Sequence, residues 1–270
     1  MQSGKALAGL RFDRFTLDFT NRVTAATLSR TDEFWSPRLG LVYKPVPQAS
    51  IYTSFSRSYL PQSGDQFNSL DATTAALAPE RFDNYEIGAK WDIRPALALT
   101  AALYRLDRAH TRAPGTTPGA IVLTGEQRSQ GLELALSGAI TPNWQASLGY
   151  TLQDVEIRST TAAAPAGRKA ALAPRHQAFA WSRYNLSSSF GFGLGISYQS
   201  ESFTSISNLV VLPAYARVDA ALYASIGFGI EAQLNIENLF DTGYFATAHN
   251  DNNITPGGPV AVRFTLSKRF

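Results

Sequence analysis

The sequence contains no cysteine and only three histidines among its 270 residues. Without cysteine the chain can form no disulfide framework, no thiolate zinc site and no catalytic thiol. The histidines, His110, His176 and His249, lie far apart and form no H-x-x-x-H pair, so we expect no metal site. The sequence also lacks any run of about 18 to 20 apolar residues, which excludes a membrane-spanning helix.

Charge of one sign is also scarce. The chain has 24 Lys and Arg against 21 Asp and Glu, for a net charge of +3, and the basic residues are scattered singly among the acidic ones. No continuous basic face results, so we expect no nucleic-acid partner. The opening "MQSGKALAGL" has no apolar core and no small-residue cleavage site. We therefore expect either a chain that is not exported or one whose true N-terminus is missing from this sequence.

What the sequence does have is alternation. In the closing "PVAVRFTLSKRF", Val260, Val262 and Phe264 fall on one side, whereas Arg263 and Thr265 fall on the other. A period of two predicts a β-strand. About twelve segments share this pattern, at residues 5–17, 36–44, 50–58, 83–93, 96–106, 128–139, 144–155, 176–186, 190–200, 215–224, 228–239 and 260–270.

The connections between these strands alternate in length. Short turns such as "DIRP" and "ITPN" are separated by long polar segments such as "RAHTRAPGTTPGAIVLTGEQ" and "DTGYFATAHNDNNITPGG". Outer-membrane barrels have short turns at one end and long loops at the other. The pattern predicts an all-β fold, an antiparallel transmembrane β-barrel with its apolar face toward lipid.

Two sets of side chains follow from the alternation. The lumen would be lined by Glu86, Lys90, Asp92, Glu133, Asp219 and Glu231, and the membrane interface near the short turns by Tyr43, Trp91, Trp144, Phe190 and Phe228.

Several stretches resemble the TonB-dependent siderophore receptors. They include "SPRLGLVYKP", "IYTSFSRSYLPQSGDQF", "LAPERFDNYEIGAKWDI", "TGEQRSQGLEL" and "LNIENLFDTGYFATAHNDNNITPGGPVAVRFTLSKRF", which together span nearly the whole chain. The sequence is most similar to the catecholate branch of the Fiu type. This resemblance implies an outer-membrane receptor of the Gram-negative envelope that imports a ferric siderophore with energy from TonB. It implies no enzyme activity and no cofactor, because the siderophore carries its own iron.

The resemblance also sets expectations about the extent of the chain. Members of the family close about 22 strands around a plug and carry a TonB box. We expect residues 1–270 to be the C-terminal portion of such a barrel, without plug or box, so that the TonB complex would be reached through a preceding region. About twelve strands would form an open arc rather than a narrow closed barrel. Phe270 resembles the terminal signal read by the barrel-assembly machinery.

A ferric siderophore of this type is an anion with flat aromatic donors. A receptor therefore needs cationic, hydrogen-bonding and aromatic groups at its external mouth. The candidate contact residues are Arg57, Tyr59, Gln62, Phe67, Arg108, His110, Arg128, Arg175, His176, Tyr198, Phe203, Tyr244 and His249. For any single arginine, a solvated loop charge or a charge paired across strands is the alternative interpretation.

Three other functions stay open at this point. A self-contained 12-strand barrel could be a phospholipase-like enzyme, which needs a serine beside a histidine on the outer wall, and "PRHQAFAW" offers His176. A polar lumen without a plug could also serve as a passive channel. The third alternative is a soluble β-sandwich lectin, which would partition without detergent.

Deleting Phe270 tests the predicted assembly signal. We expect the deletion to lower the amount of protein in the outer membrane several-fold, because the last strand would no longer present its terminal aromatic residue to the assembly machinery. Quantitative immunoblotting of purified outer membranes measures the effect. Equal surface amounts of the wild type and the deletion would contradict the assignment.

Overall fold

The computed structural model describes residues 3–23, 25–61, 78–114, 121–161 and 164–268. Regular structure in these ranges consists of β-strands. No helix among the described residues is long and apolar enough to cross a membrane. The predicted residues Gln62, Phe67 and Phe270 lie outside the described ranges.

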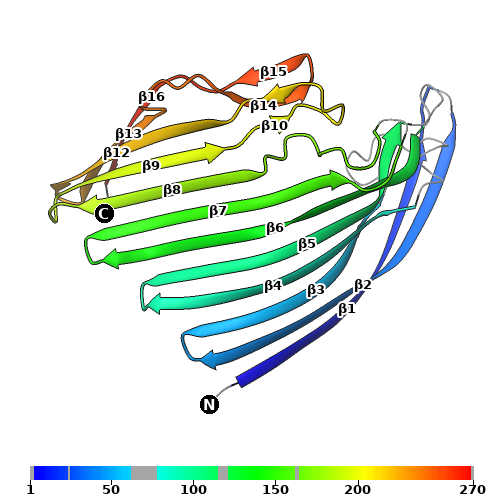
Figure 1. Ribbon diagram of the computed structural model, residues 1–270, viewed down its shortest axis with the longest axis horizontal. Helices are drawn as coiled ribbons and strands as arrows, with labels where there is room; N and C mark the ends of the chain where they lie inside the picture. Colours follow the sequence, from blue (N-terminus) through cyan, green and yellow to red (C-terminus); the bar gives the residue numbers. More distant parts are fainter. Residues whose placement is uncertain (1–2, 24, 62–77, 115–120, 162–163, 269–270) are drawn as a thin grey trace.

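Twelve strands form one antiparallel sheet in which almost every strand pairs with its neighbour in sequence (Figure 1). The strands of this sheet are β1 (Ser3–Thr20), β2 (Thr27–Val46), β3 (Ala49–Leu60), β4 (Glu80–Arg94), β5 (Leu97–Pro114), β6 (Ile121–Thr141), β7 (Trp144–Ile157), β8 (His176–Asn185), β9 (Phe190–Gln199), β12 (Tyr215–Gly227), β13 (Ile230–Glu237) and β16 (Ala261–Lys268). Within the described ranges β1 and β16 are the two ends of the sheet and do not pair with each other. The sheet is therefore open, as expected for an arc.

Two small hairpins lie outside the main sheet. They are formed by β10 (Ser202–Phe203) with β11 (Val211–Leu212) and by β14 (Phe245–Asn250) with β15 (Asn253–Pro256). Both interrupt connections that the sequence pattern predicted to be irregular. The prediction missed them because their strands are only two to six residues long, which is too short for a clear alternation.

Several strands of the main sheet are longer than predicted. β2 begins at Thr27 instead of residue 36. β5 ends at Pro114 instead of residue 106, and β6 begins at Ile121 instead of residue 128. The predicted long loop between residues 108 and 127 is therefore mostly a strand pair, in which Arg108 faces Gln127. The prediction was wrong here because the sequence of these extensions does not alternate regularly between apolar and polar residues, so no period of two marks them.

The predicted short turns lie at one rim of the sheet, at the left of Figure 1. The strands turn at residues 47–48, 95–96, 142–143, 186–189 and 228–229. The long connections and both small hairpins lie at the opposite rim, which we call the far rim (Figure 1). The predicted alternation of connection lengths is thus confirmed as a spatial segregation of turns and loops.

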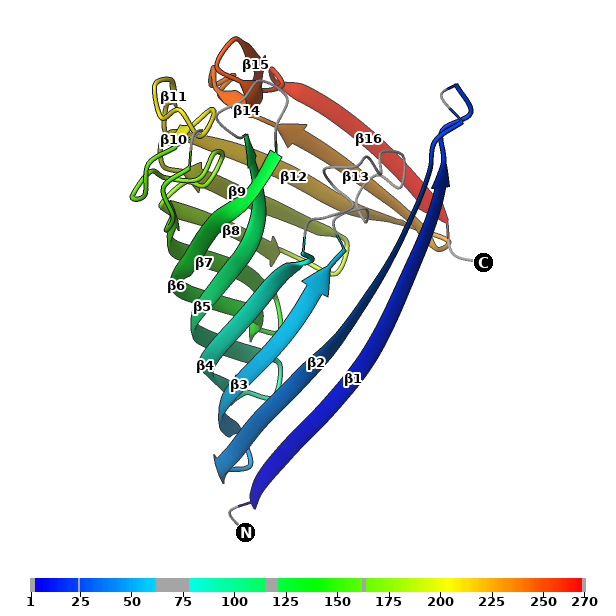
Figure 2. The same cartoon turned by 90° about the vertical axis from the view of Figure 1, so that its right-hand side faces the viewer.

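Residues that pair directly across antiparallel strands point to the same side of a sheet. The register therefore sorts side chains into two faces of the curved sheet, which is seen edge-on in Figure 2. One row across four strands consists of Phe192, Leu222, Leu234 and Phe264, and the adjacent row on the other side consists of Gly193, Ala221, Asn235 and Arg263. We call the apolar side the outer face and the polar side the inner face.

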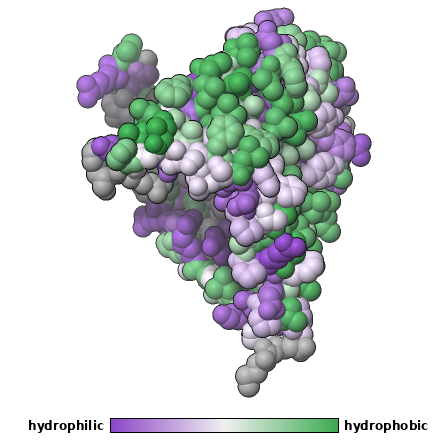
Figure 3. All heavy atoms as spheres, turned by 90° about the vertical axis from the view of Figure 1, so that its left-hand side faces the viewer, coloured by the Kyte–Doolittle hydropathy of each residue, from purple (hydrophilic) through white to green (hydrophobic). Residues whose placement is uncertain are grey.

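The two faces differ in polarity as a membrane barrel requires. Leu41, Ile87 and Leu194 on the outer face are more than half exposed, because no other part of the chain covers them. Figure 3 shows hydrophobic side chains along the outer wall and hydrophilic ones in the hollow. Apolar side chains that stay exposed over a whole wall are stable only against lipid.

The charged residues predicted to line the lumen occupy the inner face. By register, Glu86 pairs with Tyr104 and Glu133 with Ala102, both on the inner face. Tyr52, next to them, donates a hydrogen bond to Glu86. The predicted interfacial aromatics near the short turns, among them Trp91, are exposed on the outer face or, for Phe228, in the turn itself.

Glycines on the inner face of β7 and β9 make room for two aromatic rings of β8. A Cβ atom on Gly149 would lie 2.1 Å from Cε1 of Phe179, and one on Gly195 would lie 2.4 Å from Cε3 of Trp181. Gly193 approaches the same tryptophan. The rings therefore lie flat against the wall of the hollow instead of projecting across it.

Hydrogen bonds join the loops of the far rim to one another. Asp251, between β14 and β15, accepts bonds from Oγ1 of Thr204 at 2.5 Å and from Oγ of Ser207 at 2.8 Å. On its other side the same segment is held by Asn208, whose amide exchanges two bonds with the backbone of Lys169, each 2.9 Å long. Residues 203–210 are thus fixed between two neighbouring loops.

Arginine scanning of β7 tests the assignment of the faces. Leu148→Arg on the outer face is expected to lower the free energy of unfolding by about 2–4 kcal/mol, because it places a charge in lipid near the midplane. Ser147→Arg on the inner face is the matched control and should cost much less. Urea titration in lipid bilayers measures both, and similar losses would show that the faces are reversed.

The hydroxyl groups around Asp251 lower the pKa of its carboxyl group, with the bond from Thr204 as the largest cause. A lowered pKa means that the contact is intact above the ordinary value of about 3.9 and is lost as the pH falls through the lower folded value. We expect Asp251→Asn to raise hydrogen exchange of residues 203–210 several-fold at pH 7. In the wild type a similar rise should occur only below about pH 4.

Asp18→Asn, near the tip of the β1–β2 hairpin, is the control for this variant. It should leave the exchange of residues 203–210 unchanged. Exchange in Asp251→Asn that matches the wild type would show that the carboxylate does not hold the loops together.

Candidate functional site

The far rim is the place where polar and aromatic side chains could meet a ligand, because the loops gather there. The candidate residues predicted from the sequence reach this rim on both faces of the sheet. The register separates those that point into the hollow from those that point outward. Only the inner group can line an entrance to the lumen.

On the inner face, Arg108 of β5 forms the first of two cationic centres. Its Nη2 atom donates to Oε2 of the buried Glu80 at 2.6 Å, and its guanidinium carbon lies 5.4 Å from the ring centroid of Phe82. His110 follows on the same strand, where its Nδ1 atom lies 3.1 Å from the carbonyl oxygen of Pro79. This centre presents a guanidinium group on an aromatic face.

The second cationic centre is Arg217 of β12. Nη2 donates to Oδ2 of Asp219 at 2.9 Å, and Nη1 donates to the hydroxyl of Tyr244 at 3.2 Å. The ring of Tyr244 stacks on Tyr215 with 4.5 Å between centroids. The Nε atom of Arg217 is buried and has no hydrogen-bond partner among the described residues. The centre thus combines two stacked tyrosine rings with a guanidinium group that has donor hydrogens left over.

The loop that carries Tyr244 is fixed by a buried asparagine. Asn238 donates from its backbone to Oδ1 of Asp219 and from its side chain to the carbonyl oxygens of Thr242 and Gly258. It also accepts a bond from the backbone of Thr242 through Oδ1, 2.9 Å long. Asn238 has a φ of 53°, which asparagine tolerates better than most residues. This network holds the loop tyrosine against β12.

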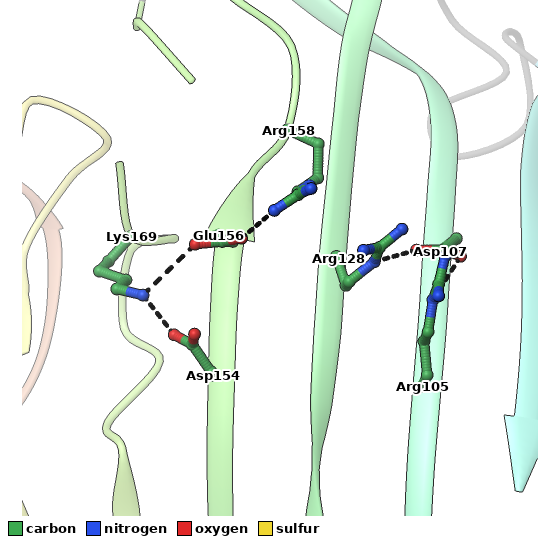
Figure 4. Close-up of polar contacts among 7 residues, drawn as sticks. All are labelled: Arg105, Asp107, Arg128, Asp154, Glu156, Arg158 and Lys169. Carbon is green, nitrogen blue, oxygen red and sulfur yellow. Dashed lines mark hydrogen bonds and ion pairs between the residues drawn. The ribbon is translucent and has the colours of Figure 1, made fainter. Parts of the chain in front are cut away.

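Two predicted arginines lie on the outer face instead. Arg57 donates to Asp83 at 2.5 Å and Arg128 donates to Asp107 at 2.6 Å. With Glu156 they form a continuous cross-strand row from β3 to β7, which we call the charged row. Its β5–β7 part is shown in Figure 4 with the neighbouring side chains that pair with it. Tyr59 lies two residues beyond Arg57 on β3.

The other predicted residues are spread around the far rim. His176 and Tyr198 have the register of the outer face, and Nδ1 of His176 lies 2.9 Å from the hydroxyl of Tyr150. Arg175 accepts a backbone bond from Gln153 through its carbonyl oxygen. Two more residues lie in the small hairpins, Phe203 in β10 and His249 in β14.

The sequence-based selection missed the most connected residue of the site, Arg217. Its position was readable, because it has the same parity as Asp219, which was assigned to the lumen. Tyr215 shares this parity as well. Their partner Tyr244 was selected, but only the structure shows that a loop more than twenty residues away folds back onto β12.

His176, the histidine that a barrel enzyme would use, lies on the outer face. Its imidazole contacts the hydroxyl of Tyr150, and its backbone nitrogen donates to Oγ of Ser200 at 3.0 Å; in the part of the chain that the structure describes, no hydrogen bond joins this imidazole to a serine. Among the described residues no cluster of three or more His, Cys, Asp or Glu side chains could hold a metal ion. A guanidinium group beside stacked phenols suits a planar anionic ligand.

The chain matches a known family over most of its length. Residues 5–239 match the family described as TonB dependent receptor-like, beta-barrel. The sequence is 30% identical to the probable TonB-dependent siderophore receptor PiuA of Acinetobacter baumannii over 267 residues, which cover 92% of this chain and 36% of that protein. It is 27% identical to the catecholate siderophore receptor Fiu of Escherichia coli K12, with 92% and 34% covered.

Solved structures agree with these sequence relationships. The crystal structure of PiuA superposes with a TM-score of 0.89 at 28% identity, over 97% of this chain and 40% of that one. The closed form of Fiu gives a TM-score of 0.84 at 24% identity, over 99% and 42%. The chain spans about a third of the length of the curated relatives it matches. By sequence and by fold, the chain belongs to the TonB-dependent receptors, the outer-membrane β-barrel proteins of Gram-negative bacteria.

Proposed function

We propose that this chain is the C-terminal barrel portion of an outer-membrane receptor that takes up ferric siderophores of the catecholate type. The observation that carries the proposal is the inner-face centre at the far rim, where Arg217 lies beside the stacked pair Tyr215 and Tyr244. Similarity to PiuA and to the catecholate receptor Fiu supports the same ligand class. The far rim is then the external mouth.

The chemistry of the ligand fits the two cationic centres. A ferric catecholate is a bulky anion with flat rings, and its iron is already fully coordinated. Arg217 can offer the guanidinium hydrogens that Asp219 and Tyr244 do not use, and Tyr215 can offer a ring face. Arg108, on the inner face of β5, supplies a second cation over an aromatic ring. The protein needs to supply no iron ligand.

We further propose that uptake is driven by TonB through a part of the protein that precedes residue 1 of this chain. The inner face carries polar and charged groups on several strands, which suits an occupant such as a plug. Lys90, for example, lies 5.7 Å from the ring centroid of Tyr52 beside Glu86. The family resemblance supports this arrangement, which twelve strands alone do not provide.

The alternative functions find no comparable support. The homologues are transport receptors, which favours transport over phospholipase activity. A soluble lectin does not fit a chain of this family, with its exposed apolar wall. A passive channel would not require the cation and phenol cluster held in place by Asn238.

Uptake of iron-55 tests the proposal in cells that lack other catecholate receptors. The intact receptor that contains this chain should take up a ferric catecholate in a TonB-dependent manner and should not take up a ferric hydroxamate. Arg217→Gln should reduce uptake about tenfold at subsaturating ligand, because a charged hydrogen bond is lost. Arg14→Gln on the outer face is the control. Uptake that is independent of TonB, or equal for both iron complexes, would contradict the proposal.

A further inference from the structure

A depression of about 470 Å³ lies in the outer face, where lipid meets the barrel. Here "the hollow" means this outer-face depression and not the lumen enclosed by the inner face. It is formed by β2 to β5, and Arg105 lines it on the side of the far rim. The outer-face side chains around it include Leu39, Leu41, Phe55, Ile87, Leu103 and Arg105. A shallow depression lined mainly by apolar side chains of four neighbouring strands suits an acyl chain.

The arginine at the edge of the hollow belongs to a cluster with surplus positive charge. Arg105 and Arg128 both pair with Asp107, at 2.7 and 2.6 Å. On the neighbouring strands Arg57 and Arg81 both pair with a second aspartate, at 2.5 and 3.2 Å. Four arginines thus share two carboxylates, which leaves two positive charges uncompensated.

The two halves of this cluster are adjacent. Asp83 and Asp107 pair directly across β4 and β5 in the charged row. The remainder of the row is balanced, because Glu156 contacts both Arg158 and Lys169, and Lys169 also contacts Asp154 (Figure 4). The excess charge is therefore confined to the part of the row directly beside the hollow.

The position of the charged row matches the headgroup level of the membrane. Asp83 lies eight residues from the interfacial Trp91 on β4. Eight residues span about 26 Å along a strand and roughly 20 Å along the membrane normal after tilting. The charged row thus lies within about 5 Å of the end of an apolar band of about 25 Å, on the side of the external leaflet, where long arginine side chains reach the headgroups.

We propose that the hollow and the adjoining arginine cluster bind a phosphorylated lipid of the outer leaflet, with an acyl chain in the hollow and its phosphates on the guanidinium groups. Arginine recognises phosphate through paired, charge-assisted hydrogen bonds. Each half of the cluster has one cation in excess, so a lipid with two phosphates satisfies both halves. The proposal rests on the outer-membrane location of the family and is independent of the siderophore.

Binding can be measured by native mass spectrometry of the receptor purified from outer membranes in detergent. The probe is lipid A with two phosphates, compared with phosphatidylglycerol and phosphatidylcholine. The double variant Arg57→Gln/Arg105→Gln should lower the bound fraction of lipid A at least tenfold. It should still fold, because Asp83 keeps Arg81 and Asp107 keeps Arg128.

Arg11→Gln is a matched control for the charge. Arg11 donates Nε to Asp13 two residues along its strand, as Arg105 does to Asp107, but it lies on the inner face. A second pair tests the hollow. Thr53→Trp fills the hollow and should weaken lipid A binding, whereas Val262→Trp adds the same side chain on the outer face of β16, away from it.

Each result decides the proposal. Preferential binding of lipid A that both hollow and arginine variants weaken, with both controls unchanged, supports it. Equal binding of phosphatidylglycerol overturns the two-phosphate assignment, and equal binding of phosphatidylcholine overturns the role of phosphate. Wild-type affinity in the arginine variant or in Thr53→Trp overturns the site itself.

Discussion

Backbone hydrogen bonding in a medium without water is the constraint on which the rest of this structure depends. An unpaired N–H or C=O group in lipid costs several kcal/mol, so every spanning strand needs a partner on both sides. The described strands meet this demand in one continuous ladder from β1 to β16. Only the two outermost edges lack partners within it, and in a wider barrel those edges are where further strands would join.

Alternation made the spanning parts of the fold predictable from the sequence. Strands such as Phe190–Gln199 place large apolar side chains on one face and glycines on the other, and this pattern exists because lipid and lumen differ in polarity. The rule stops where the strand leaves the membrane. Around Arg108 and Gln127 both sides of the strand meet water, so pairing continues while the pattern disappears. The small hairpins of the far rim were missed because their strands are too short to show a period.

The sequence predicted at which end of the strands the candidate residues lie, but it predicted less well whether they point to the inner or the outer face. Position along a strand placed Arg57 and Arg108 near the same rim, yet the register turns Arg57 outward and Arg108 inward. Parity with Ile51 already contained this information for Arg57. The contact of Arg217 with Tyr244 was beyond sequence reasoning, because it depends on a loop that the buried Asn238 folds back. Local pattern gives strand and side, whereas contacts between loops are a tertiary property.

The glycines beneath Phe179 and Trp181 also bear on the shape of the wall. β9 carries large side chains on its outer face and glycines on most of its inner face, so the strand is bulkier on the convex side of the sheet than on the concave side. The sheet can then curve around the lumen without clashes between inner-face side chains, and the rings of Phe179 and Trp181 lie along the wall of the lumen. A larger residue at Gly195 would tip the indole into the passage while every backbone bond remained in place. The size of the inner-face side chains can therefore set the width of the lumen independently of the backbone hydrogen bonds that stabilise the sheet.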